Sequence, residues 1–120
     1  MPHLTIEYTA NLPGFDAAAA LSQLNHALVE SGEFGEQDIK SRAIRLDTFL
    51  VGTVPDGRGY VHVKVAILSG RTAQTKRAVS DALLAVLQQA GSWPAHIEVQ
   101  LCVEIQEMER ESYAKAVVAG

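Results

Sequence analysis

Residues 60–68 read YVHVKVAIL, and this stretch decides the fold. Apolar side chains occupy alternate positions, so that one face carries Val61, Val63, Val65 and Ile67. Successive side chains of a β-strand point to opposite faces, so a period of two is typical of a half-buried strand. The pattern predicts a strand over 60–68 with one face in a core.

The residues that follow predict a helix and a second strand. Thr72 is a suitable N-cap for a helix over 73–90, and Gly91 and Pro94 end it. The helix has an apolar stripe at helical spacing: Val79, Ala82, Leu83, Val86, Leu87 and Ala90. Residues 97–105 alternate again and predict another strand.

The first half of the chain repeats this order. Residues 3–9 alternate, Asp16 is a candidate N-cap for a helix over 17–31, and a further strand is predicted over about 39–47. The apolar stripe of this helix is Ala17, Leu21, Leu24 and Leu28, with Gly32 as its stop.

The two halves, about 2–47 and 60–106, are expected to be pseudo-repeats in one domain spanning 1–120. A linker over about 48–59 joins them and contains the turn 55–59, a candidate hairpin tip. The tail from about 107 to 120 is predicted to form a short helix.

The predicted fold class is α+β, built from two α/β-type β-α-β units. A strand–helix–strand crossover implies parallel pairing within each half. We expect a four-stranded mixed sheet with two helices on one face. The other face is mixed, and water or other subunits must cover it: Thr5, Glu7, His62, Lys64, Glu98, Gln100 and Glu104.

Composition excludes several function classes. The chain has 10 Lys+Arg against 14 Asp+Glu, a net charge of −4, so a general nucleic-acid binder is not expected. No apolar run is long enough to span a bilayer, and no secretory signal is visible, so a cytoplasmic protein is expected.

The four histidines lack metal-ligand spacing, so neither metal nor cofactor is predicted. The single cysteine, Cys102, is expected to be buried as a small packing residue.

Pro2 is the candidate catalytic residue. Removal of Met1 would leave a secondary amine at the start of a strand, and such an amine is a compact base or nucleophile. If Met1 stays, the Pro2 nitrogen is an amide and cannot act as a base. Nearby cations disfavour a protonated amine and bind carboxylates, and Lys40, Arg42 and Arg71 are the candidates. The open alternatives are a chance Met-Pro start and ordinary surface charges.

Five segments together resemble the 5-carboxymethyl-2-hydroxymuconate isomerase family of the tautomerase superfamily. They are PHLTIEY at 2–8, IKSR at 39–42, DT at 47–48, YVHV at 60–63 and GRT at 70–72. The resemblance implies a homotrimer whose subunit looks like two fused copies of a half-length unit. It also implies that Pro2 is the base and that Arg42 and Arg71 bind substrate. Lys40 stands where the family has an arginine; lysine keeps the charge but lacks the planar fork.

The predicted function is therefore a cofactor-independent isomerase or tautomerase. It would move a proton on an unsaturated 2-hydroxy (enol) polycarboxylate, with Pro2 as acid and base. The expected substrate is 5-carboxymethyl-2-hydroxymuconate, which arises in the breakdown of homoprotocatechuate. The alternatives are another tautomerase-superfamily activity, such as phenylpyruvate-type tautomerisation or 3-oxo acid decarboxylation, and a non-catalytic trimeric ligand-binding protein.

Overall fold

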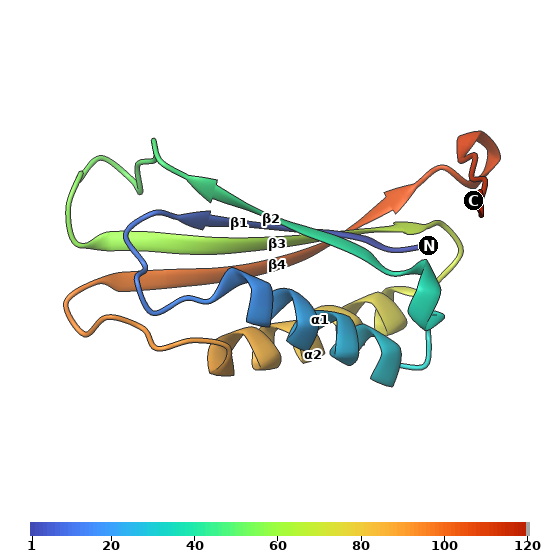
Figure 1. The fold of residues 1–120 in the computed structure, drawn as a ribbon, viewed down its shortest axis with the longest axis horizontal. Helices are drawn as coiled ribbons and strands as arrows, with labels where there is room; N and C mark the ends of the chain where they lie inside the picture. Colours follow the sequence, from blue (N-terminus) through green and yellow to red (C-terminus); the bar gives the residue numbers. More distant parts are fainter. Residues whose placement is uncertain (120) are drawn as a thin grey trace.

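A computed structural model describes residues 1–119 of the chain. The strands form one sheet in the order β2-β1-β3-β4, and two helices lie side by side on one of its faces (Figure 1). The bounds are β1 (His3–Thr9), α1 (Ala17–Glu30), β2 (Lys40–Leu46), β3 (Arg58–Leu68), α2 (Ala73–Gln89) and β4 (Glu98–Met108). β1 pairs with β2 and β3 with β4 in parallel, whereas β1 and β3 are antiparallel. The predicted mixed sheet, with parallel pairing within each half, is confirmed.

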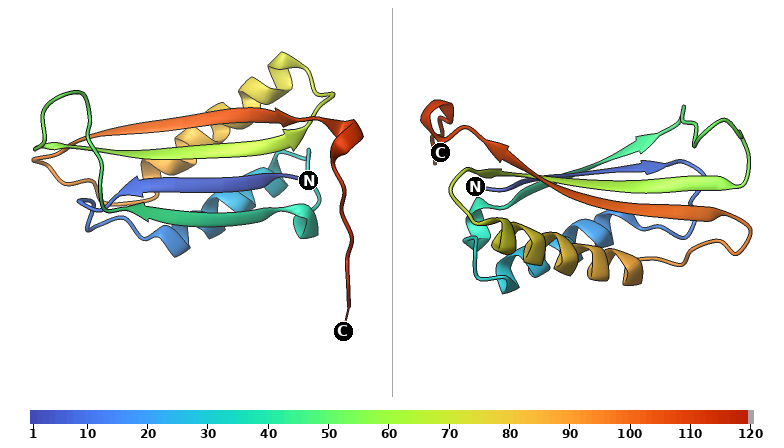
Figure 2. Two further views of the ribbon diagram at one scale, coloured as in Figure 1. Left: turned by 90° about the horizontal axis from the view of Figure 1, so that it is seen from above. Right: turned by 180° about the vertical axis from the view of Figure 1, so that it is seen from behind.

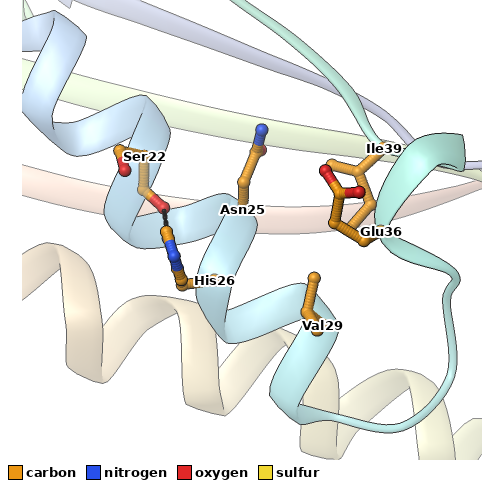
Figure 3. Close-up of a pocket in the computed structure, with 6 residues that line it drawn as sticks. All are labelled: Ser22, Asn25, His26, Val29, Glu36 and Ile39. Atoms are coloured by element: carbon orange, nitrogen blue, oxygen red, sulfur yellow. Dashed lines mark hydrogen bonds between the residues drawn. The ribbon is translucent and has the colours of Figure 1, made fainter.

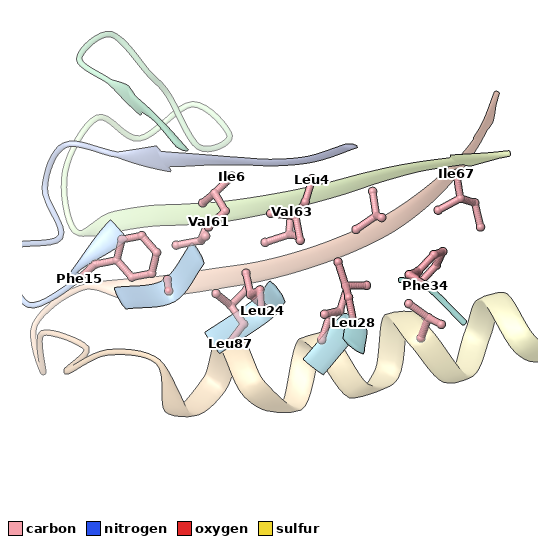
Figure 4. Packing of buried hydrophobic residues seen from close by; sticks show 14 of the residues in the cluster. Leu4, Ile6, Phe15, Leu24, Leu28, Phe34, Val61, Val63, Ile67 and Leu87 are labelled. Atoms are coloured by element: carbon pink, nitrogen blue, oxygen red, sulfur yellow. The ribbon is translucent and has the colours of Figure 1, made fainter. Parts of the chain in front are cut away.

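The core lies between the sheet and the helices (Figure 4). The alternation that predicted β3 is confirmed, because its four apolar residues have at most 1% of their surface exposed. Leu24 and Leu28 of α1 and Leu83 and Leu87 of α2 are buried against them. Burying one such side chain contributes roughly 1.5–3 kcal/mol, so this layer is the main source of stability.

Both predicted helix caps are present. Asp16 Oδ1 accepts a hydrogen bond from the backbone N–H of Ala19 at 3.0 Å, and Thr72 Oγ1 accepts one from Thr75 at 3.1 Å. Gly32, with φ of +77°, follows the end of α1 in the left-handed conformation that favours glycine. No helix in the described part of the chain is long and apolar enough to cross a membrane.

Within residues 1–119, no helix or loop covers the sheet face opposite the helices, as Figure 2 shows. The register places Thr5, Lys64 and Glu104 across neighbouring strands on this face. Cys102 also lies on it and is exposed, so the prediction that it is buried is wrong. The reason is the pleat: Leu101 packs toward the helices, so the next residue must face the other way.

The linker between β2 and β3 and the tail after β4 both differ from the prediction. β1 lies between β2 and β3, so the turn at 55–59 does not join neighbouring strands and is not the tip of a hairpin between them. The local bridge in the linker pairs Val51 with Val54.

The helix predicted over 107–120 is wrong for the described residues. β4 continues to Met108, which pairs with Leu68, and only a 3-10 turn, η2 (Arg110–Ser112), follows. Pairing with Ile67 and Leu68 of β3 holds Glu107 and Met108 in the strand. Gly120 lies outside the described residues.

Candidate active site

Pro2 precedes β1, a central strand, at the end of the sheet where the N-terminus lies (Figure 1). Its side chain is fully buried, and its carbonyl oxygen accepts a hydrogen bond from the Lys40 N–H at 3.1 Å. The backbone and ring of Pro2 are therefore held on a rigid element. With Met1 in place, the Pro2 nitrogen is an amide.

Lys40 and Arg42 project from β2 beside this end. Lys40 pairs in register with His3, and its ammonium donates to the backbone oxygen of Asp38. Arg42 pairs with Thr5 and is exposed. Two residues along a strand span about 6.6 Å, so Arg42 lies one pleat further from the N-terminus than Lys40 does.

Arg71 comes from the loop between β3 and α2 and is held by the segment that follows α1. Its Nε donates to Glu33 Oε1 at 3.0 Å, and its Nη2 donates to the Glu33 carbonyl oxygen at 2.8 Å. The guanidinium carbon lies 4.6 Å from the centroid of the Phe34 ring, a cation–π geometry. A guanidinium has five N–H donors, so three stay available to a carboxylate.

Electrostatics connect these side chains with the N-terminus. Burial lowers the pKa of the Met1 amino group, and the charges of Arg71, Lys40 and Lys115 lower it further, while Asp38 acts in the opposite direction. Burial likewise lowers the pKa of His3, with Lys40, Arg42 and the N-terminal charge adding to the effect. The structure thus brings Lys40 and Arg71 to the N-terminus and places Arg42 near His3.

Sequence reasoning missed four residues around this end. Glu33 holds Arg71, and Asp38 Oδ1 accepts a hydrogen bond from Lys115 Nζ at 2.9 Å. This hydrogen bond lowers the pKa of the Asp38 carboxyl. The Tyr113 hydroxyl lies 2.8 Å from His3 Nε2. The partners are 38 to 110 positions apart, so no local pattern could have found them.

A hollow lies away from these residues, between α1 and the segment that leads into β2 (Figure 3). It encloses about 560 Å³ and is lined by Ser22, Asn25, His26, Val29, Glu36 and Ile39. Its lining includes Glu36 but no lysine or arginine, whereas Glu33 and Asp38 near the N-terminus are each paired with a cation, so the hollow suits a carboxylate ligand less well. We therefore place the candidate active site at the N-terminus. Within residues 1–119, no group of three His, Cys, Asp or Glu side chains is arranged to hold a metal ion.

The sequence model of the 5-carboxymethyl-2-hydroxymuconate isomerase family matches residues 2–118. The chain belongs to the 5-carboxymethyl-2-hydroxymuconate isomerase family. It is thus an isomerase, and the recognition made from short segments is confirmed over nearly the whole chain. None of the curated proteins matches it significantly.

Solved structures agree with this family membership. A 5-carboxymethyl-2-hydroxymuconate isomerase from Deinococcus radiodurans R1 is 31% identical, with a TM-score of 0.84, and the match covers 96% of this chain and 88% of that one. A 5-carboxymethyl-2-hydroxymuconate delta-isomerase is 20% identical, with coverage of 98% and 89% and a TM-score of 0.77. A fused 4-OT symmetric trimer is 18% identical, with coverage of 95% and 91% and a TM-score of 0.75. The last two show the fold alone, and that fold is the predicted tautomerase-like one.

Proposed function

We propose that this family member isomerises 5-carboxymethyl-2-hydroxymuconate by a cofactor-independent proton transfer with Pro2 as the base. The observation that carries the proposal is the gathering of Lys40 and Arg71 at the buried end of β1 where Pro2 lies. A site with cations beside a fixed proline suits a substrate with several carboxylates. The 31% identical Deinococcus isomerase supports this substrate class.

Removal of Met1 is the first requirement, since it converts the Pro2 amide into a secondary amine. Burial and neighbouring cations both disfavour a protonated amine, so they favour the neutral, basic form of Pro2. The neutral nitrogen takes the proton of the substrate 2-hydroxyl, and the O–H bonding pair becomes the C2 carbonyl as the double bonds shift. The protonated proline then delivers a proton to carbon 5, where a C–H bond forms. The product is the 2-oxo isomer, and no electron is gained or lost.

The basic residues supply binding and charge stabilisation. Arg71 has three free donors in a fixed plane, which fits a carboxylate held by two parallel hydrogen bonds. Lys40 and Arg42, from the neighbouring strand, are proposed to bind the other carboxylates and to stabilise the negative charge that develops on the 2-oxygen. Lys40 acts as a point charge, because it lacks the fork of an arginine.

We also propose that the chain works as a homotrimer. The sheet face opposite the helices has no cover within the described protomer (Figure 2). The apolar side chains of Ile44 and Leu50, at and beyond β2, are 43% and 58% exposed. Light scattering should give three times the 12.9 kDa of one chain; a monomer at assay concentration would contradict this proposal.

A substrate panel tests the proposed activity. Purified chain is offered the three-carboxylate dienol, a two-carboxylate 2-hydroxymuconate, phenylpyruvate and malonate semialdehyde. We expect the highest kcat/KM for the three-carboxylate dienol. Highest activity on phenylpyruvate or on malonate semialdehyde would indicate another tautomerase-superfamily reaction instead. Carboxylate binding without any turnover would indicate a ligand-binding protein.

A further inference from the structure

The segment that follows β4 crosses the N-terminal end of the sheet. Figure 2 shows it leaving β4 and passing the N-terminus toward the β2 side. Arg110 Nη2 donates to the Ser69 carbonyl oxygen at 2.7 Å, just after β3. Tyr113 lies against His3 at the start of β1, with a hydroxyl-to-Nε2 distance of 2.8 Å and ring centroids 5.9 Å apart. The segment is therefore fixed across β3 and β1 in turn.

The third contact brings a cation to the candidate site. Lys115 Nζ lies 2.9 Å from Asp38 Oδ1, immediately before β2. The same ammonium lies 3.4 Å from the sulfur of Met1. An ammonium has three N–H donors. One of those of Lys115 is donated to Asp38, and another points to the Met1 sulfur, a weak acceptor in the residue before Pro2.

Removal of Met1 changes the surroundings of this ammonium. The thioether leaves with Met1, and the space that it filled adjoins both Lys115 Nζ and the new Pro2 amine. A substrate bound for proton transfer at Pro2 must occupy this region. A carboxylate there would replace a weak sulfur acceptor by a charged oxygen, and hydrogen bonds to charged groups are the stronger ones.

We propose that Lys115 is a further substrate-carboxylate-binding residue, held over the site by Asp38 and by the Tyr113–His3 and Arg110–Ser69 contacts. The inference rests on the proposed function, since it places the substrate beside Pro2. It also gives the site a fourth cation, in addition to Lys40, Arg42 and Arg71. Lys115 and Lys40 bring two ammonium groups to Asp38 from two segments of the chain, one to its carboxylate and one to its backbone oxygen.

Tricarballylate, a non-reactive tricarboxylate, is the probe. It is titrated by calorimetry into processed protein whose intact mass shows that Met1 is absent. Lys115→Met should weaken binding roughly tenfold, as expected for one charge-assisted contact at a partly exposed site. Lys115→Arg should restore most of the affinity. The matched control is Lys76→Met, which removes a lysine paired with Glu107 between α2 and β4 and should leave affinity unchanged.

Tyr113→Phe is a second variant that keeps the lysine but removes the hydroxyl contact with His3; we expect about threefold weaker binding. Unchanged affinity in Lys115→Met would overturn the inference, whatever the affinity of Tyr113→Phe. Equal losses in Lys115→Met and Lys76→Met would overturn it too. If wild-type protein binds tricarballylate through Lys115 but does not convert the dienol, the proposed function fails and the carboxylate-binding role stands. If wild-type protein does not bind tricarballylate, the inference fails.

Discussion

Arg71 is the basic residue whose orientation the structure defines most fully. Glu33 takes its Nε and one Nη2 hydrogen, and Phe34 lies against its plane, so only one edge of the guanidinium faces a ligand. Replacing Arg71 by Met removes the whole carboxylate-binding edge. Replacing Glu33 by Gln keeps an oxygen acceptor and removes only the charge that orients the arginine. Comparing the two variants therefore separates the binding of the substrate carboxylate by Arg71 from the orientation of Arg71 by Glu33.

The magnitudes follow from these contacts. Charge-assisted hydrogen bonds contribute about 1.5–3 kcal/mol, so Arg71→Met should lower kcat/KM about 10- to 150-fold. The Glu33–Arg71 pair is partly exposed, at 36% and 21% of the side-chain surfaces, and solvent screens it. Such a pair contributes about 0.2–1 kcal/mol, so Glu33→Gln should lower kcat/KM only about 1.4- to 5-fold.

The assay follows loss of the dienol absorbance under initial-rate conditions, with KM and kcat measured separately. Arg77→Met is the matched control, because Arg77 pairs with Asp81 on the exposed side of α2 and should not affect turnover. Arg71→Lys should fall between the wild type and Arg71→Met, since the charge remains without the fork. The reasoning is refuted if Arg71→Met keeps more than half of the wild-type kcat/KM, or if Arg77→Met loses as much.

Three further predictions concern stability. Burial and nearby cations lower the pKa of His3 in the folded state. The unfolded state therefore binds more protons than the folded state once the pH falls below about 6.5, and the protein loses stability there. His3→Gln should flatten the fall in melting temperature between about pH 7.5 and 5.5. Gly59→Ala would place a Cβ 2.7 Å from Thr9 Oγ1 and should cost about 1–3 kcal/mol in urea unfolding, whereas a cost below 0.5 kcal/mol would contradict the crowding. Leu24→Ala should cost about 2–5 kcal/mol, against under 1 kcal/mol for Val29→Ala, which changes a residue 38% exposed; similar losses would contradict the assigned core.

The elements could be predicted from the sequence because each has a local signal. The strict alternation over 60–68 needs one buried face, and the stripe in 73–90 needs one buried side, so burial follows directly from spacing. The caps at Asp16 and Thr72 are equally local, since each bonds a residue three positions away. Parallel pairing within each half followed from the crossover rule.

The details of the site could not be predicted, because they depend on which elements meet. No sequence pattern shows that Glu33 reaches Arg71 or that Lys115 reaches Asp38, since strand order and the path of the last segment decide both. The tail from 107 was assigned a helix because neither the pairing of Glu107 and Met108 with β3 nor the distant contacts of the segment that follows were visible in the sequence. Cys102 was assigned to the core because small apolar residues are usually buried, whereas the pleat of β4 places it on the uncovered face.

The central claim is that a free Pro2 amine carries the proton. The most direct measurement is turnover of the dienol by protein of known intact mass, in three forms: processed wild type, wild type acetylated at the N-terminus, and Pro2→Ala. The account predicts full turnover in the processed wild type and a loss of at least about 100-fold in the other two forms, the lower range for a positioned acid–base group. Near-full activity in the acetylated protein or in Pro2→Ala would contradict it.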